Sequence, residues 1–463
     1  MAGIGFELKK LYRKKGLFNN SKAILYSIAV TIGPTVICMA TLLFFNILLK
    51  NAKVNIEGQN IIQATIMYSF IFLLILTSGY SMVISRYISD KLYEKKYQDI
   101  KASLYGAILI IVSIGSIIGI LFYFKSPLDI TYKVLAYILF IELIIEIILS
   151  VYVTALENFK VITAAFFIGF LCTAIISSLM ITYTNINPLI ILIASFDVGL
   201  LLLILILYYE IQKYFKIDNK NYFEFLGWFK KHYLLFAINT FYTLAIYIHN
   251  FVFWMVSDMN YVVGETFIYC PSYDVPAFYA LVSTLPTMIM FVVKFETSFF
   301  DKFKVYFHFV NNGASYKDIE VAREEMKEVL FREITYIMMF QLIITVVAIF
   351  IGDNIFMRMG FTSQMIDEFN ILALGYYCMM MIFVITNVLL YFDDRKGAFV
   401  LNGIFLVTNM LFTIKTTILG ERYFGMGIFI SAIIVMCLGL LRLKYFTNNI
   451  EYYVFCKNVR WSK

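Results

Sequence analysis

Long apolar stretches are the feature of this sequence that most restricts its fold. About twelve stretches are each long enough to cross the hydrocarbon layer of a bilayer as a helix, which takes about 20 residues. Backbone N–H and C=O groups find no water in that layer, so a spanning segment must satisfy them internally. Only 15% of the residues are charged, compared with about 25% in soluble domains. The sequence therefore predicts an all-α polytopic membrane protein.

The predicted spans fall into two groups of six, separated by a basic segment. The first six cover residues 24–49, 61–84, 102–124, 131–156, 161–183 and 188–209, and the last six cover 232–256, 277–300, 331–352, 369–392, 397–418 and 426–446. We predict a six-helix bundle at 24–209, a cytoplasmic linker at 210–231, a second six-helix bundle at 232–446, a cytoplasmic amphipathic N-terminus at 1–23 and a cytoplasmic tail at 447–463. Two bundles around a shared cavity are typical of transporters. Sequence identity between the two halves is not visible.

The orientation follows from the distribution of Lys and Arg, because retained loops are basic on the cytoplasmic side. With the N-terminus inside, 30 of the 38 basic residues fall in cytoplasmic segments, seven fall outside, and Lys294 lies within a span. Both termini are therefore predicted to be cytoplasmic. This topology and attraction to anionic lipid headgroups account for the net charge of +7 without a nucleic-acid partner.

The segments between the spans are too short for a catalytic domain. The longest are the central linker and residues 301–330, and no GxxxxGK[ST], HExxH, GxSxG or paired CxxC motif is present. We expect no enzymatic activity, no cofactor and no metal site. The adjacent acids Asp393 and Asp394 lie in a short turn and are expected to be solvated. A capping-box pattern at Ser315 and Asp318 predicts a cytoplasmic helix over 315–330.

Three acids fall within the spans of the first half. Glu142 and Glu146 are four residues apart near the middle of the fourth span, so they project from one helix face, and Asp197 lies in the middle of the sixth. Charges at this depth are costly and are functional candidates by default. They could line a polar cavity and couple transport to protons or cations. Alternatively, they bond to neighbouring helices and only fix the packing.

The second half carries ionisable candidates nearer the ends of its spans. Lys294 and Glu296 lie toward the cytoplasmic end of the eighth span, as translocation residues or as a snorkelling or locally paired group. His249 lies in the outer part of the seventh span. It is either a gate or substrate contact or a packed hydrogen-bonding residue.

Helix-breaking residues mark possible gates. Gly33 and Pro34 fall within the first predicted span and Pro286 within the eighth. Each proline removes a backbone donor and can kink or open a helix where a pathway passes. Ordinary kinks, which are frequent in membrane helices, are the alternative interpretation.

Two segments resemble a known family. The opening Met-Ala-Gly-Ile-Gly-Phe-Glu-Leu-Lys-Lys-Leu, residues 1–11, looks like the start of the PelG family of exopolysaccharide exporters. Residues 271–281, Pro-Ser-Tyr-Asp-Val-Pro-Ala-Phe-Tyr-Ala-Leu, and 294–300, Lys-Phe-Glu-Thr-Ser-Phe-Phe, resemble its segment around the eighth span. The chain length, the span count and an aromatic seventh span ending in Phe253-Trp254 agree with the resemblance.

The resemblance implies a bacterial inner-membrane protein of the flippase-like MOP superfamily. It further implies a cytosolic glycosyltransferase partner, PelF, membrane partners PelD and PelE, and activation through cyclic di-GMP sensed by PelD. The implied substrate is a cationic, partly deacetylated amino-sugar polymer of a biofilm matrix. Three alternatives remain: a flippase for lipid-linked oligosaccharide, a MATE-like antiporter of the same superfamily, and a membrane scaffold for the polymer synthase.

Overall fold

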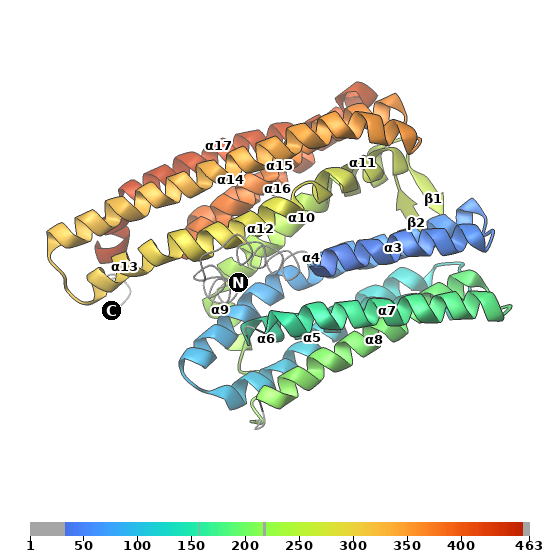
Figure 1. Ribbon diagram of the computed structural model, residues 1–463, viewed down its shortest axis with the longest axis horizontal. Coiled ribbons are helices and arrows are strands. Elements are labelled where there is room, and N and C mark those ends of the chain that lie inside the picture. Colours follow the sequence, from blue (N-terminus) through green and yellow to red (C-terminus); the bar gives the residue numbers. More distant parts are fainter. Residues whose placement is uncertain (1–32, 157, 216–218, 457–463) are drawn as a thin grey trace, which may run out of the picture.

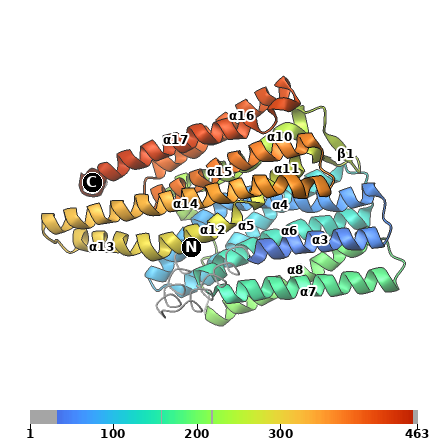
Figure 2. The same ribbon diagram turned by 45° about the horizontal axis from the view of Figure 1, so that its top comes forward.

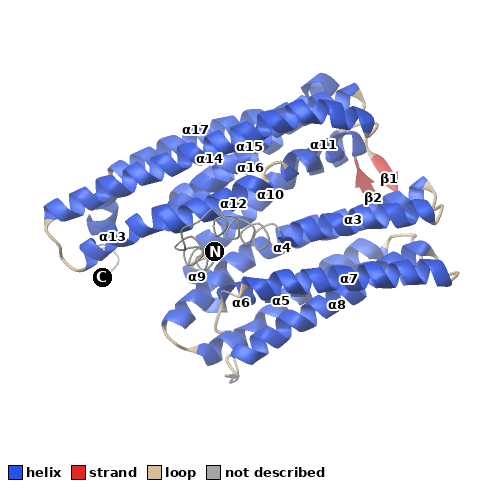
Figure 3. Ribbon diagram, in the orientation of Figure 1, coloured by secondary structure: helices blue, strands red, loops and turns tan. Residues whose placement is uncertain are grey.

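The computed structural model describes residues 33–156, 158–215 and 219–456, and these are almost entirely helical (Figures 1 and 3). The first half comprises α3 (Gly33–Asn51), α4 (Ile56–Tyr93), α5 (Tyr97–Phe124), α6 (Ile130–Ala155), α7 (Phe159–Tyr183) and α8 (Pro188–Tyr214). A short helix, α9 (Leu226–Lys231), lies in the linker. The second half comprises α10 (Tyr233–Val256), β1 (Tyr261–Val263), β2 (Phe267–Tyr269), α11 (Pro271–Val282), α12 (Leu285–Lys294), α13 (Phe300–Asn311), α14 (Tyr316–Arg358), α15 (Ser363–Tyr391), α16 (Arg395–Leu419) and α17 (Met426–Asn448).

The all-α polytopic prediction is confirmed. Within the described residues, eleven helical segments are long and apolar enough to cross a membrane, and α3 contributes a shorter apolar stretch, Met39–Asn51. Residues 24–32 of the first predicted span lie outside the described residues. The single β-hairpin that the described part of the chain contains joins α10 to α11.

The two halves repeat one packing pattern. In the first half α6 packs against α4, α5 and α8, while α7 packs against α3 and α8. In the second half α15 packs against α11, α14 and α17, while α16 packs against α10 and α17. Figures 1 and 2 show the halves as two helical bundles lying side by side. The chain therefore contains a structural repeat whose two copies start on the same side of the membrane.

One pair of helices provides the most extensive contact between the halves, α4 from the first and α10 from the second. Near the middle of α4, Gly79 has no side chain, and a Cβ placed there would lie 2.6 Å from the Phe236 ring. Beside it, the Asn239 amide donates to the Ser78 carbonyl at 2.7 Å. Beyond the first bundle, α4 makes smaller contacts with α9, β1 and β2. The helix α4 is therefore the element along which the two halves meet.

The eighth span is broken, whereas the sequence predicts one helix over 277–300. The break separates α11 from α12, and Pro286 lies in the first turn of α12. Proline has no N–H for the helical ladder, so carbonyl groups just before it need other donors. Gln341 of α14 donates its amide to the Ser283 carbonyl at 3.4 Å and accepts a hydrogen bond from the Thr287 hydroxyl. The adjacent helix thus stabilises the break.

The helix predicted over 315–330 is present but is not separate from the ninth span. It forms the first part of α14, a 43-residue helix about 65 Å long at 1.5 Å per residue. The Ser315 hydroxyl caps it by accepting from the Asp318 N–H at 3.3 Å. No Gly or Pro interrupts residues 316–351, so the helix runs without a break from its polar first part into the apolar span.

The expectation that Asp394 is solvated is wrong. Its carboxylate is buried, accepts two hydrogen bonds from Arg442 of α17, at 2.8 and 3.0 Å, and caps α16 through the Gly397 N–H. Only Asp393 is exposed. In the first half Asn158, which precedes α7, bonds to Glu210 of α8 at 2.7 Å. Different residue types thus make the equivalent connection in each half, which hides the repeat at the sequence level.

The close α4–α10 approach predicts an unequal response to two glycine substitutions. Gly79→Ala should reduce the free energy of unfolding by about 1–3 kcal/mol, because a methyl group at this position overlaps Phe236. Gly403→Ala is the matched control on α16, since its Cβ would lie 3.8 Å from Phe241 of α10, an ordinary contact distance. Thermal unfolding of the purified variants measures the difference. Equal melting temperatures would show that α4 and α10 do not need the close approach.

Candidate functional site

The acids predicted from the sequence lie on two helices that pack together, α6 and α8. Asp129 caps the outer end of α6 by accepting from the Thr131 N–H at 3.0 Å. Asn187 caps α8 in the same way, by accepting from the Leu189 N–H at 3.0 Å, and Pro188 opens the helix. Both caps fix where the helices begin. Along the helix axes, Glu142 then lies about 20 Å and Asp197 about 15 Å from these ends, deep within the membrane.

The three carboxylates differ in their bonding. Glu146 is buried and accepts a hydrogen bond from the Ser150 hydroxyl at 2.7 Å. Asp197 is only 7% exposed, and neither of its oxygens has a hydrogen-bond partner among the described residues. Glu142 lies close enough to act electrostatically on Asp197, and its Oε2 is also buried without a partner in the described chain. The packed helices α6 and α8 therefore hold three carboxylate oxygens, one of Glu142 and two of Asp197, that are buried without a partner in the described residues.

The repeat shows that the fold does not need acids at these positions. At the same distances from their N-caps, α15 carries Gly375 and Met379 in place of Glu142 and Glu146. In α17 the residue at the same distance from the N-cap as Asp197 is Val435. The second half packs with these uncharged residues. An unpaired buried carboxylate destabilises a folded protein, so acids at positions where the other half packs uncharged residues favour a functional role.

His249 forms part of a polar core in the second half. Its side chain is fully buried, its Nδ1 lies 2.9 Å from the Tyr273 hydroxyl and its Nε2 lies 3.2 Å from the Tyr376 hydroxyl. A neutral imidazole donates through one nitrogen and accepts through the other, so both tyrosines can be satisfied at once. The geometry corresponds to the packed, hydrogen-bonded alternative. A gating role for His249 stays a prediction.

Asp274 is a buried acid that the sequence interpretation missed. Its carboxylate accepts from the Asn250 amide at 2.7 Å, the Trp254 indole N–H at 2.8 Å and the Cys270 backbone N–H at 2.8 Å. The group is buried and fully engaged, and it joins the start of α11 to the end of α10. Its signal in the sequence was the position just after Pro271, where an acid is favoured in the first helical turn. The predicted span began at residue 277 and so left Asp274 outside.

Glu368 was missed for a similar reason. It lies in α15, one residue before the predicted start of that span, and it is only 2% exposed. Its Oε1 accepts from the Gln364 amide at 2.9 Å, while Oε2 has no partner in the described residues. The first-half position at the same distance from the N-cap is Leu135. The two halves therefore differ here as well, with a buried acid, Glu368, in the second half and an apolar residue, Leu135, in the first.

The remaining candidates lie apart from the acids on α6 and α8. Lys294 is 3.7 Å from Glu333 of α14 and lies over the Tyr336 ring at 4.3 Å, so it is locally paired. The side chain of Glu296 lies outside the described residues. Gly33 and Pro34 are the first residues of the described part of α3, and their side chains are likewise not described. Their roles, and that of Pro286, stay predictions.

Contacts hold residues of the linker to both halves, at the helix ends near α9. Lys91 of α4 is 2% exposed and lies 2.8 Å from Asp99 and 2.7 Å from Glu224, which precedes α9. His232 follows α9, and its Nδ1 accepts from Arg395 at 2.8 Å. Burial and the nearby Arg395 charge lower the pKa of His232, so its ring is neutral at pH 7 and remains an acceptor. These contacts fix the linker between the bundles.

Residues 1–455 match a protein family described as "PelG: Putative exopolysaccharide Exporter (EPS-E)". The chain belongs to the PelG family. The match confirms the resemblance carried by residues 1–11 and 271–300 and extends it over nearly the whole sequence. Family and fold are those of transporters. No curated protein matches the chain.

Solved transporter structures share the fold of this PelG-family protein. An outward-facing multidrug resistance MATE family transporter of the MOP superfamily gives a TM-score of 0.65 at 14% identity, covering 93% of this chain and 96% of its own. A MOP superfamily transporter from Pyrococcus furiosus gives 0.62 at 14% identity over 93% and 96% of the two chains. An inward-facing MATE transporter gives 0.62 at 10% identity over 92% and 98%. At these identities the likeness establishes the MATE-like transporter fold of a multi-pass membrane protein.

Asp274 provides a test of the polar core in this PelG-family protein. Asp274→Asn replaces one acceptor oxygen with an NH2 group that faces N–H donors, and it should lower the free energy of unfolding by about 3 kcal/mol. Asp367→Asn, at an exposed position of α15, is the control and should leave stability within about 0.5 kcal/mol. Thermal unfolding of the purified proteins provides the comparison. A loss no larger than that of the control would contradict a structural role for the carboxylate.

Proposed function

We propose that this protein moves a Pel-like amino-sugar exopolysaccharide, made by a cytosolic glycosyltransferase, across the bacterial inner membrane to the biofilm matrix. The coarser function, a membrane transporter of the PelG family, rests on the family match and the MOP-superfamily fold. The observation that carries the mechanism is the pair of unpartnered acids Glu142 and Asp197 deep in the first bundle. Two bundles that meet mainly along α4 and α10 could then alternate between inward and outward access.

Ion coupling is the role we propose for the acids of α6 and α8. A nascent acetylated polymer is neutral, so it gains little from a carboxylate at the middle of the membrane. A proton or a monovalent cation binds favourably there, because Glu142 and Asp197 offer three buried oxygens that have no partner in the described residues. Glu146, already bonded to Ser150, would support the site from the same helix face.

The proposed pathway uses the other candidates as contacts and hinges. Pro286 and the break before α12 would let α11 move relative to α12. Gly33 and Pro34 would provide a similar hinge in the first span. His249, Lys294 and Glu296 would act along the pathway through the second bundle.

The proposed partners come from the family resemblance. A PelF-like glycosyltransferase would deliver polymer to the cytoplasmic side, where the basic residues of the linker and of the loops between spans accumulate. PelD-like and PelE-like membrane proteins would complete the assembly and bring in control by cyclic di-GMP. Neighbouring genes that encode these proteins would support this proposal.

A second candidate function is favoured by the MATE-like fold. Several of the structures that share it are multidrug resistance MATE family transporters, and a small-molecule antiporter would use the same buried acids. A flippase for lipid-linked oligosaccharide is the related alternative. Lipid extraction after gene deletion distinguishes polymer export from flipping of a lipid-linked oligosaccharide. Loss of a flippase would cause lipid-linked sugar to accumulate, whereas loss of a polymer exporter would not.

Neutralising the acids should separate function from stability. Glu142→Gln and Asp197→Asn should each lower secreted polymer at least ~10-fold, because neither side chain can then exchange a proton or bind a cation. Their melting temperatures should stay the same or rise, since each variant removes a carboxylate that has at least one oxygen buried without a partner in the described residues. Polymer secretion, normalised to membrane expression, and thermal unfolding are the two measurements. Asp367→Asn, exposed on α15, is the matched control.

The two measurements together decide the role of the acids. Unchanged secretion in both variants would remove Glu142 and Asp197 from the transport mechanism. A large loss of stability together with a loss of secretion would instead assign them to packing.

A further inference from the structure

The connection between the first and second spans differs in length and structure between the two halves. In the first half α3 joins α4 through residues 52–55, whereas in the second half α10 joins α11 through residues 257–270, which hold the β-hairpin. In the hairpin Tyr261 pairs with Tyr269 and Val263 with Phe267. The turn has φ of +54° at Gly264 and +48° at Glu265, a conformation that matches the twist of paired strands. The second half therefore carries an added, ordered element at its outer end.

The hairpin packs on the opposite half of the protein. The Thr266 hydroxyl lies 2.7 Å from the Ser126 hydroxyl, which follows α5. The Ile268 N–H donates to the Tyr68 hydroxyl at 3.0 Å, and that hydroxyl donates to the Ile268 carbonyl. The Phe267 ring lies 5.8 Å from the Phe122 ring. Figure 1 shows the hairpin beside the first bundle, at the end of the molecule opposite α9 and α13.

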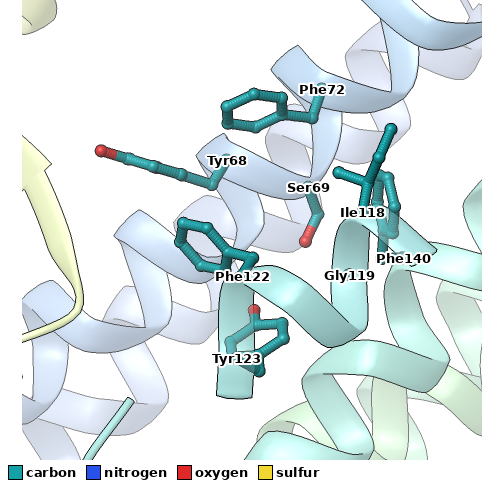
Figure 4. Close-up of a pocket in the computed structure, with 8 residues that line it drawn as sticks. All are labelled: Tyr68, Ser69, Phe72, Ile118, Gly119, Phe122, Tyr123 and Phe140. Atoms are coloured by element: carbon teal, nitrogen blue, oxygen red, sulfur yellow. The ribbon is translucent and has the colours of Figure 1, made fainter. Parts of the chain in front are cut away.

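Aromatic side chains extend this contact inward from the hairpin. Trp254 of α10 stacks on Tyr68 of α4, with ring centroids 4.8 Å apart and planes 7° apart. One turn deeper, Phe251 lies 5.9 Å from Phe72. Figure 4 shows Tyr68, Phe72 and Phe122 among the side chains that line a small pocket together with Ser69 of α4. Rings from both halves therefore close the outer end of the α4–α10 contact.

The two attachments of the hairpin differ in strength. On its own half, the Cys270 N–H at the end of β2 and the Trp254 indole both donate to the buried Asp274 carboxylate. Hydrogen bonds to a charged acceptor are roughly twice as strong as neutral ones. On the first half, the polar contacts of Thr266 and Ile268 are to neutral hydroxyl groups only. The contact with the first half is the one that can open.

We propose that the hairpin, residues 261–269, is the outer gate of the transporter, fixed to the second half by Asp274 and closing reversibly against Tyr68 and Ser126. This inference rests on the proposed function, because a gate requires a transported substrate. The structure then corresponds to a state closed toward the outside. Opening would separate Thr266 from Ser126 and Phe267 from Phe122, while the bonds of Asp274 stay intact.

A reversible cross-link tests the gate in the full-length protein. Ser126→Cys with Thr266→Cys places two thiols where hydroxyl groups now lie 2.7 Å apart, within reach of a disulfide. Oxidation should lower polymer secretion about tenfold, and a reductant should restore it, because the gate can no longer open. The native Cys270 will not compete, since burial raises the pKa of its thiol to about 11.

Two controls separate the gate from a general effect of oxidation. Tyr261→Cys with Tyr269→Cys joins residues that face each other across the hairpin, so it fixes the hairpin internally without tying it to the first half. This variant should form its disulfide and keep secreting polymer. The single variants Ser126→Cys and Thr266→Cys should not respond to oxidant.

The outcomes distinguish the gate from the proposed function. If the Ser126–Thr266 pair cross-links and secretion continues, the hairpin is not a gate, although the protein still exports. If the pair does not cross-link, the closed arrangement is wrong. If deletion of the whole gene leaves secretion unchanged, the proposed function itself fails.

A second variant tests the gate without a cross-link. Phe267→Ala removes the ring that packs on Phe122, and Ser69→Cys places a probe thiol at a residue that is 5% exposed behind the aromatic cluster. A membrane-impermeant maleimide added from outside should label the probe several-fold faster when Phe267→Ala is present. Equal labelling rates with and without Phe267→Ala would contradict the gate.

Discussion

The packing of α4 against α10 is the interaction on which the architecture depends, because each half places most of its other contacts within itself. Gly79 lets the two helices approach closely, and Asn239 fixes their register through the Ser78 carbonyl. Two further contacts involve α4. Tyr68, in its first half, holds the proposed gate, and Lys91, near its last turn, pairs with Asp99 and Glu224. A long, narrow contact of this kind holds two bundles together and still allows them to rotate about it, as alternating access requires.

The halves share a scaffold but differ in how they treat buried charge. In the second half, Asp274 is satisfied by three donors and His249 by two hydroxyl groups, so these residues stabilise one arrangement. In the first half, Glu142 and Asp197 leave oxygens without partners, at positions where the second half packs apolar or small residues. Satisfied polar groups define a structure, whereas unsatisfied acids are ready to bind a proton or cation. Glu368 of the second half also keeps one oxygen without a partner in the described residues, but its other oxygen accepts from Gln364, whereas Asp197 has no partner at either oxygen. This difference supports a coupling role for the first bundle and an anchoring role for the outer part of the second.

Hydropathy predicted most of the fold, because the bilayer forces each apolar segment into a helix whatever its neighbours are. Hydropathy alone made the predicted spans shorter than the helices. Glu368 and Asp274 therefore lay outside the predicted spans and were missed. Asp394 was placed in solvent because sequence cannot tell that Arg442, 48 residues later, covers the turn. The β-hairpin has strands of only three residues, and its partners Tyr68 and Ser126 are 140–200 positions away. Contacts between residues so far apart in the chain produce no recognisable pattern in the local sequence.

A coupled exporter must link its ion site to its gate, and helix α6 offers the shortest connection. Near its outer end, the Tyr132 hydroxyl lies 2.7 Å from Thr65 of α4, one helical turn from the gate residue Tyr68. Glu142 lies ten residues further along α6, about 15 Å deeper in the membrane. A change of charge at Glu142 and Asp197 alters the repulsion between α6 and α8, and a shift of α6 reaches α4 through Thr65 and Tyr132. Because Tyr68 holds the hairpin from α4, the contact between α6 and α4 links the occupancy of the acids to the closure of the gate.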